Sequence, residues 1–190
     1  LSADDNYVLD MDGKVADITG SPFTNPDLLN PGTHSMVIYN RAEGFTFDGR
    51  MARVNAPDGK SRADGASVIP LPGYLKTISQ EITVTADDTL RVNPVPQQRV
   101  RDLQLELEVT QGRPELIQSV TATLSGIAGI FDMEKGQTIG EPTSTVFSFT
   151  RDGSKLTGRR RLLVRWEPCR RWCWTSSLPM ADAHSARRST

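Results

Sequence analysis

Two carboxylates separated by one residue follow a short apolar run near the start of the chain. Residues 7–10 read Tyr-Val-Leu-Asp, and Met11, Asp12 and Gly13 come next. A strand that presents two neighbouring carboxylates suits covalent phosphoryl transfer, in which Asp10 acts as the nucleophile and Asp12 as the acid and base. The competing interpretation is a strand that ends in an Asp-Gly hairpin turn, in which neither carboxylate has a catalytic role.

The phosphoryl-transfer interpretation resembles the Asp-x-Asp-Gly signature of haloacid-dehalogenase-type phosphatases. That family needs a parallel sheet whose strands are joined by crossover helices. The chain shows almost no helical periodicity, so the hairpin interpretation is favoured. A calcium loop starting at Asp10 is disfavoured as well, because its twelfth position is Ser21 rather than glutamate. The pair Asp87 and Asp88 is interpreted as a turn between strands.

Other groupings that could support catalysis or metal binding are sparse. His34 is the one histidine before the last 32 residues, so a Ser-His-Asp or Cys-His mechanism has a single candidate base there. Cys169 and Cys173 have the wrong spacing for a zinc knuckle, and His184 adds only one further ligand. The glycines of residues 126–129 lack the lysine of a phosphate loop and predict a β-bulge or a close backbone approach. We therefore expect no enzymatic activity, no catalytic residues, no cofactor and no metal site.

The elements that would position any functional residue are strands. Polar residues Asp102, Gln104 and Glu106 alternate with Leu103, Leu105 and Leu107, which predicts a strand with one face on a core and one in water. Similar signals predict strands at residues 6–10, 35–39, 45–47, 81–85, 89–95, 98–110, 119–124, 143–150 and 155–157. Residues 114–118 suit one helical turn, and residues 55–65 suit an exposed loop.

These strands predict an all-β fold in which antiparallel sheets pack as a β-sandwich. At 190 residues the chain accommodates two small domains. We expect an N-terminal β domain, complete or incomplete, over residues 1–72, and a C-terminal β-sandwich domain over residues 73–158. Residues 159–190 form an atypical tail.

Charge is distributed unevenly along the chain. The total is −1, but residues 159–190 carry +6 from eight arginines against Glu167 and Asp182, which leaves −7 on residues 1–158. An acidic body repels phosphate, so nucleic acid is not an expected partner. The tail alone could bind nucleic acid or a membrane through arginine and tryptophan, which is the less favoured interpretation.

The tail is better interpreted as the product of a shifted reading frame. Codons compatible with residues 172–181, read two nucleotides later, give Val-Leu-Asp, three apolar residues, Ala, a residue such as Asp, and Gly. That is a strand ending in a turn. We hypothesise that a frameshift near residues 159–164 replaced the last strands of the fold, and sequencing the gene tests this directly.

Three segments carry a resemblance to a known family. Residues 31–40, residues 71–75 and above all residues 120–136, with their Leu-Ser-Gly-Ile-Ala-Gly block, resemble the fimbrial anchor and minor-subunit proteins of Bacteroidetes. The resemblance implies two transthyretin-like β-sandwich domains. It also implies an exported lipoprotein at the outer membrane, on the cell surface, joined to a fimbria. The lipid-bearing cysteine would lie upstream of Leu1.

The function implied by the resemblance is fimbria assembly or adhesion by β-strand addition. An edge strand with unpaired main-chain groups accepts a strand from a neighbouring fimbrial subunit, and surface ligands of host or bacterium are further partners. The alternative is a surface module that binds carbohydrate or another ligand. Its candidate stacking residues are Tyr39, Phe45, Phe47 and Tyr74.

Overall fold

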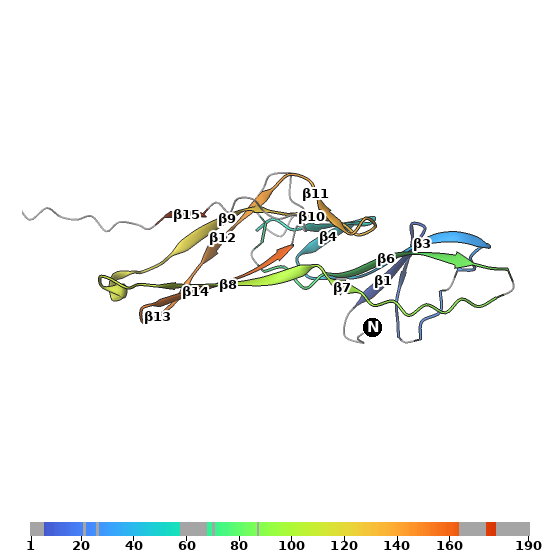
Figure 1. The fold of residues 1–190 in the computed structure, drawn as a ribbon, viewed down its shortest axis with the longest axis horizontal. Helices are drawn as coiled ribbons and strands as arrows, with labels where there is room; N and C mark the ends of the chain where they lie inside the picture. Colours follow the sequence, from blue (N-terminus) through green and yellow to red (C-terminus); the bar gives the residue numbers. More distant parts are fainter. Residues whose placement is uncertain are drawn as a thin grey trace, which may run out of the picture.

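The structure is a computed structural model that describes residues 6–20, 22–25, 27–57, 68–69, 71–86, 88–163 and 174–177. Within these ranges it contains strands, one 3-10 turn and no α-helix. Every strand pairing is antiparallel. The predicted all-β, antiparallel sandwich is confirmed, and Figure 1 shows it as an elongated molecule.

Two sheets, A and B, face each other at one end of the molecule. Sheet A has the strand order β2-β1-β3-β6-β7, and sheet B has the order β11-β10-β5-β4. The strands of sheet A are β1 (Tyr7–Met11), β2 (Lys14–Asp17), β3 (Gly32–Asn40), β6 (Lys76–Val84) and β7 (Gln97–Gln98). Those of sheet B are β4 (Phe45–Asp48), β5 (Met51–Val54), β10 (Ile130–Asp132) and β11 (Gln137–Ile139).

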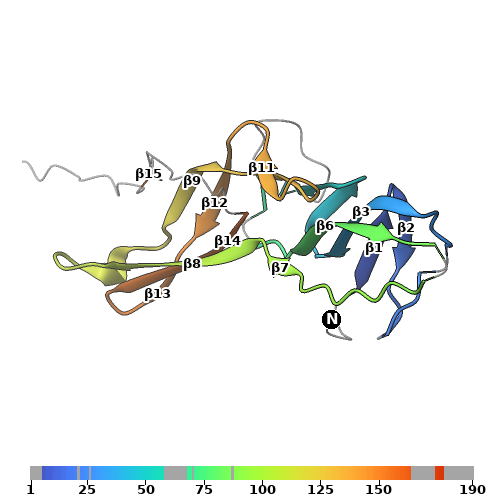
Figure 2. The same ribbon diagram turned by 45° about the vertical axis from the view of Figure 1, so that its right-hand side comes forward.

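Two further sheets, C and D, form the other end (Figures 1 and 2). Sheet C has the order β13-β14-β8, and sheet D has the order β12-β9-β15. The strands of sheet C are β8 (Val100–Glu108), β13 (Thr150–Asp152) and β14 (Lys155–Leu163). Those of sheet D are β9 (Thr121–Ile127), β12 (Thr143–Ser148) and β15 (Trp174–Ser177), and the 3-10 turn η1 (Pro114–Leu116) lies between β8 and β9.

The first strand is buried on both faces. Alternate residues of a strand point to opposite sides, so Val8 and Asp10 face sheet B whereas Tyr7, Leu9 and Met11 face the other way. Val8 belongs to a core that runs through the whole molecule. Tyr7, Leu9 and Met11 belong to a smaller core on the outer face of sheet A, together with β3, β6 and apolar side chains of residues 18–29.

Sheets C and D enclose the other part of the main core. Phe147 and Phe149 lie 5.2 Å apart between ring centroids. Gly158 of β14 faces them, and a Cβ on this residue would lie 3.1 Å from each ring. A larger residue at position 158 would therefore have to displace these two rings, which glycine leaves room for.

Most predicted strands overlap observed ones, but the strand predicted at residues 155–157 continues to Leu163, the one at residues 143–150 is divided into β12 and β13, and the one at residues 89–95 is wrong. These residues run extended and join no sheet. Pro94 and Pro96 cannot donate a main-chain hydrogen bond, which weakens pairing on a sheet. The short strands β2, β5, β10 and β11 were not predicted. The predicted helical turn at residues 114–118 is observed as η1.

Pairing connects residues on both sides of the predicted domain boundary. β3 pairs with β6, and β5 pairs with β10, so sheets A and B each combine strands from before and after residue 72. The division into residues 1–72 and 73–158 as separate folding units stays a prediction.

The predicted tail begins inside a regular strand. β14 continues to Leu163 in unbroken register with β8. β15 pairs with β9, with Trp174 opposite Leu124. Residues 164–173 and 178–190 lie outside the described residues, as do Cys169, Cys173 and His184. The frameshift stays a hypothesis.

Candidate functional site

Asp10 is the fourth of the five residues of β1 and is only 2% exposed. Its Oδ1 accepts a hydrogen bond from the main-chain N–H of Gly13 at 2.9 Å. The same oxygen accepts from Arg50 Nε at 3.1 Å and from Arg50 Nη2 at 2.8 Å. A carboxylate enclosed and bonded in this way is not presented to a substrate.

Arg50 connects Asp10 to three further groups. The residue sits in the turn between β4 and β5, and its Nη1 donates to Ser35 Oγ at 2.6 Å and to Glu134 Oε1 at 2.8 Å. Its Nη2 also donates to the Ser35 carbonyl at 3.1 Å. Hydrogen bonding to Asp10 raises the pKa of Arg50. We call Asp10, Ser35, Arg50 and Glu134 the Arg50 clamp, because together they join sheet A to two turns of sheet B.

Asp12 occupies the turn that follows β1. Its φ of 51° lies in the left-handed region, and Gly13 has a φ of 85°. Met11 pairs with Lys14, so the turn has two residues, as in a type I′ hairpin. The interpretation of Asp12-Gly13 as a hairpin turn is therefore confirmed. β1 is flanked by the antiparallel strands β2 and β3, so the parallel sheet required by the phosphatase motif is not its context.

His34 and Asp12 form a close ion pair at this turn. His34 Nδ1 lies 2.6 Å from Asp12 Oδ2, and His34 Nε2 lies 2.7 Å from the Asn30 carbonyl. Because both ring nitrogens face acceptors, the hydrogen bond to Asp12 and that to Asn30 raise the pKa of His34. Hydrogen bonds from His34 and from the Ser35 N–H lower the pKa of Asp12. His34 lies near the start of β3, and its bond to Asp12 connects this strand to a turn 22 residues earlier in the chain.

The glycine-rich block forms a bulge. Thr143 pairs with Ile127 and Ser144 pairs with Ser125, so Gly126 is an extra residue on β9. Its φ of 78° is one that glycine adopts without strain. The prediction of a bulge rather than a phosphate loop is confirmed.

The four aromatic residues considered for sugar stacking are engaged within the protein. Tyr39 and Phe45 are buried, and Tyr39 stacks on Phe47 with 5.0 Å between ring centroids. The guanidinium of Arg161 lies 4.2 Å from the ring centroid of Tyr74. The Tyr74 hydroxyl donates to Asp102 Oδ2 at 2.5 Å. A carbohydrate would have to displace these contacts before it could stack on the rings.

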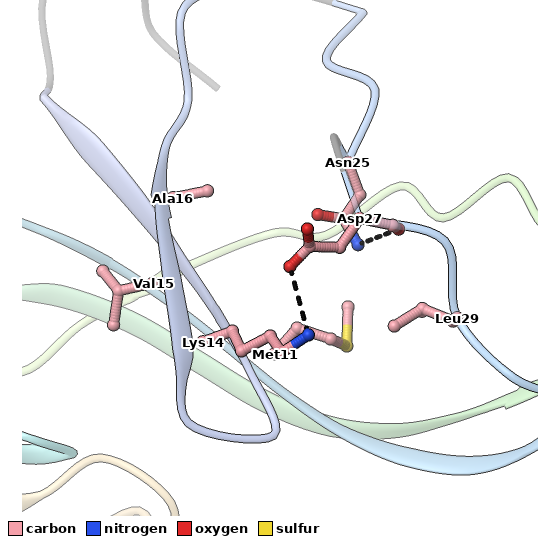
Figure 3. Close-up of a pocket in the computed structure, with 7 residues that line it drawn as sticks. All are labelled: Met11, Lys14, Val15, Ala16, Asn25, Asp27 and Leu29. Carbon is pink, nitrogen blue, oxygen red and sulfur yellow. Dashed lines mark hydrogen bonds and ion pairs between the residues drawn. The ribbon is translucent and has the colours of Figure 1, made fainter.

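A small cavity of about 180 Å³ lies near the hairpin of β1 and β2, and a more open one of about 400 Å³ lies beside Asn40, Glu43 and Tyr74. Figure 3 shows the smaller cavity lined by side chains from that hairpin and from residues 25–29. Lys14 Nζ lies 3.6 Å from Asp27 Oδ2 across it, and the Asn25 amide donates to the Asp27 carbonyl at 3.0 Å. Both contacts are solvent-exposed, and they engage the three polar side chains that line the cavity.

The described residues contain neither a cluster of metal ligands nor a membrane-spanning helix. No group of three or more His, Cys, Asp or Glu side chains gathers there as a metal site would require. None of the described segments is a helix of the length and apolarity needed to cross a membrane.

The feature best suited to recognition is the open edge of β8. This strand is nine residues long and, among the described residues, is the outer strand of sheet C, with β14 on one side only. Leu107 on its apolar face is 44% exposed. Sequence reasoning identified the strand by its alternation, but it could not tell which edge stays open, because that depends on the order of strands in the sheet.

The direction of the main-chain groups along this edge follows from the register. In the pairing of β8 with β14, Lys155 lies opposite Glu108. Val109 and Ser154 are the next pair in the same register, and the N–H of Val109 donates to the Ser154 carbonyl at 2.9 Å. Main-chain groups alternate in direction along a strand, so odd-numbered residues of β8 bond to β14. The even-numbered residues Asp102, Gln104, Glu106 and Glu108 turn theirs to the open edge.

Comparison with known proteins gives a likeness of fold. No protein-family model and no curated protein sequence matches the chain. The crystal structure of a putative adhesin from Bacteroides ovatus ATCC 8483 matches with a TM-score of 0.68 and 16% identity, over 99% of this chain and 68% of that one.

Two further crystal structures of putative adhesins are similar. One, from Bacteroides ovatus, has a TM-score of 0.51 and 11% identity, over 90% of this chain and 64% of that one. The other, from Bacteroides thetaiotaomicron VPI-5482, has a TM-score of 0.50 and 12% identity, over 93% of this chain and 69% of that one. At these identities the likeness establishes the shared fold.

Proposed function

We propose that this chain is a non-enzymatic cell-surface protein of the adhesin type, a fimbrial subunit or anchor that takes part in assembly or adhesion by β-strand addition. The observation that carries the proposal is the open, nine-residue edge of β8. The similarity of fold to putative adhesins of Bacteroides supports the adhesive role. The segments of residues 31–40, 71–75 and 120–136 that resemble fimbrial proteins support the fimbrial role.

The edge of β8 supplies the two things that strand addition requires. Its even-numbered residues direct N–H and C=O groups outward, where a partner strand can pair with them. Leu103, Leu105 and Leu107 lie on the face that an added strand would extend. Main-chain hydrogen bonds between β8 and the added strand would provide affinity, and alternate side chains of the added strand would determine which partner binds.

The location follows from the same proposal. The protein would be exported and held at the outer membrane by a lipid on a cysteine upstream of Leu1, with its sheets outside the cell. Protease treatment of intact cells that express a C-terminally tagged chain tests this. Loss of the tag without cell lysis supports surface exposure, and a tag protected until lysis contradicts it.

Strand addition is tested by a substitution that blocks the edge and spares the fold. Gln104 directs its N–H to the open side, so Gln104→Pro removes a donor from the edge without breaking the β14 ladder. Gln104→Ala is the matched control. We expect the tagged wild-type chain and Gln104→Ala to copurify with exported β-rich subunits and Gln104→Pro to lose them. Equal capture by all three proteins contradicts strand addition at β8.

A further inference from the structure

The segment between β6 and β7 has the composition of a strand but joins no sheet. Residues 89–95 read Thr-Leu-Arg-Val-Asn-Pro-Val and run extended along one end of the molecule (Figures 1 and 2). Leu90 is 47% exposed and Val92 is 38% exposed. Among the described residues, no strand pairs with this segment. We call residues 89–95 the unpaired segment.

Apolar and polar residues alternate along the unpaired segment in a pattern that matches the edge of β8. Leu90 and Val92 occupy even positions, and Arg91 and Asn93 occupy odd ones. Pro94 is also even, so a strand that pairs through its odd-numbered residues does not need the N–H that proline lacks. Over residues 90–93, one face of such a strand would be apolar and the other polar, while Val95, 69% exposed, falls on the polar side.

An antiparallel register matches the unpaired segment to β8 residue by residue. With Arg91 opposite Glu106, Leu90 lies opposite Leu107 and Val92 lies opposite Leu105. Facing residues of an antiparallel pair point to the same side, so the apolar residues meet one another and the cation meets the carboxylate. The hydrogen-bonded pairs are then Arg91 with Glu106 and Asn93 with Gln104. These even-numbered residues of β8 are the ones that direct their main-chain groups to the open edge.

The unpaired segment cannot make this pairing within its own chain. Residues 88–108 form one long ribbon that passes from one end of the molecule to the other (Figure 1). A return of the segment onto β8 would need a reversal near residues 97–99. That stretch is fixed, because Gln97 and Gln98 pair with β6 and the N–H of Arg99 donates to the Leu75 carbonyl at 2.8 Å.

We propose that the unpaired segment of one copy of this chain adds as a strand to the open edge of β8 in a second copy. This inference deepens the proposed function and rests on it, since it names the donor, the edge and the partner of the strand addition. Donor and edge lie on opposite halves of the molecule. Each copy carries both, so the contact can repeat from copy to copy.

A charge exchange tests the pairing on the full chain. We expect wild-type protein to self-associate with rising concentration in sedimentation velocity. Arg91→Glu alone and Glu106→Arg alone should each weaken self-association roughly three- to tenfold, because like charges then face each other across the strands. The double variant Arg91→Glu/Glu106→Arg should regain the wild-type constant. Arg113→Glu, an exposed charge reversal outside both elements, is the matched control and should change nothing.

Hydrogen exchange supplies the second measurement. The amides of Arg91 and Asn93 should become protected as wild-type protein self-associates, and should exchange freely in dilute solution. A chain that stays monomeric at all concentrations, or a double variant as weak as its parents, overturns the inference.

The outcomes for the two proposals are distinguishable. If the chain does not self-associate but captures other subunits in a Gln104→Pro-sensitive way, the proposed function stands and this inference fails. If it self-associates through the pair but is absent from the cell surface and captures no subunit, the inference stands and the proposed function fails.

Discussion

The Arg50 guanidinium lies 2.8 Å from Asp10 Oδ1 and joins the turn between β4 and β5 to the buried strand β1. The Asp10 side chain points to this turn because even-numbered residues of β1 face sheet B. The carboxylate that the sequence suggested as a nucleophile is thus one half of a connection between two sheets.

Removal of the cation from the Arg50 clamp should destabilise the fold strongly. Arg50→Met leaves the carboxylate of Asp10 buried without its cation, so we expect the free energy of unfolding to fall by about 3–5 kcal/mol. Urea denaturation at neutral pH measures it. Lys14→Met removes the exposed partner of Asp27 and should cost at most about 1 kcal/mol. Equal losses in the two variants would contradict the role of the clamp.

The pair formed by His34 and Asp12 should make stability depend on pH in two ranges. The pKa of His34 is raised above its ordinary value of 6.5, so its contribution is full below that value and is lost as the pH rises through the folded-state pKa. The pKa of Asp12 is lowered below 3.8, so its contribution is full above that value and is lost as the pH falls through the folded-state pKa.

The greatest contribution of the pair therefore lies between these two ordinary values, from about pH 4 to pH 6.5. Urea midpoints for the wild type and His34→Gln should differ most in that window, and the difference should shrink above pH 7. A difference that grows as the pH rises from 6 to 8 would show that the neutral imidazole is the stabilising form.

Replacement of Arg160 should stabilise the protein. The residue is 5% exposed, its Nε has no hydrogen-bond partner among the described residues, and its guanidinium carbon lies 3.7 Å from the ring centroid of Phe147. Loss of solvent around the cation lowers the pKa of Arg160 to about 10.

Arg160→Met keeps the length of the side chain and removes the buried charge, so we expect a gain of about 1–4 kcal/mol in the free energy of unfolding. Arg159→Met changes the exposed neighbour on the same strand and should stay within about 0.5 kcal/mol of the wild type. A loss of stability in Arg160→Met would mean that the cation over Phe147 outweighs the cost of burying it.

Gly73→Ala should destabilise the contact between the segment before β6 and the loop after β3. A Cβ at residue 73 would lie 2.8 Å from the main-chain nitrogen of Glu43 and 3.0 Å from its carbonyl oxygen. The same two residues are joined by a 2.7 Å hydrogen bond from the Gly73 N–H. We expect a loss of about 1–3 kcal/mol in urea denaturation, because backbone has to move. An unchanged midpoint would contradict this close approach.

Alternation made the strands of the chain predictable where one face is apolar. The strand β8 is an example, because its leucines and acidic residues alternate over most of its length. The short strands β5 and β10 escaped prediction, since three or four residues carry too little alternation to stand out. Residues 89–95 were wrongly predicted as a strand. Their composition favours extended backbone, but a strand also needs a neighbouring strand with which to pair.

The hairpin at Asp12-Gly13 and the bulge at Gly126 followed from local sequence, since both depend on glycine in the left-handed region. The Arg50 clamp could not be predicted, because Arg50 and Asp10 are 40 residues apart and meet only when sheets A and B pack. The burial of Arg160 could not be predicted either, because it depends on how β14 packs against Phe147.

The burial of β1 on two sides has a consequence for how this chain tolerates changes of length. An insertion of one residue after Tyr7 would exchange the side chains that the strand gives to its two cores. Leu9 would then occupy the site of Asp10 beside Arg50, and Asp10 would take the place of Met11 in the apolar layer of Met36 and Ile38. Homologues that differ in length should therefore vary elsewhere and conserve the spacing of β1.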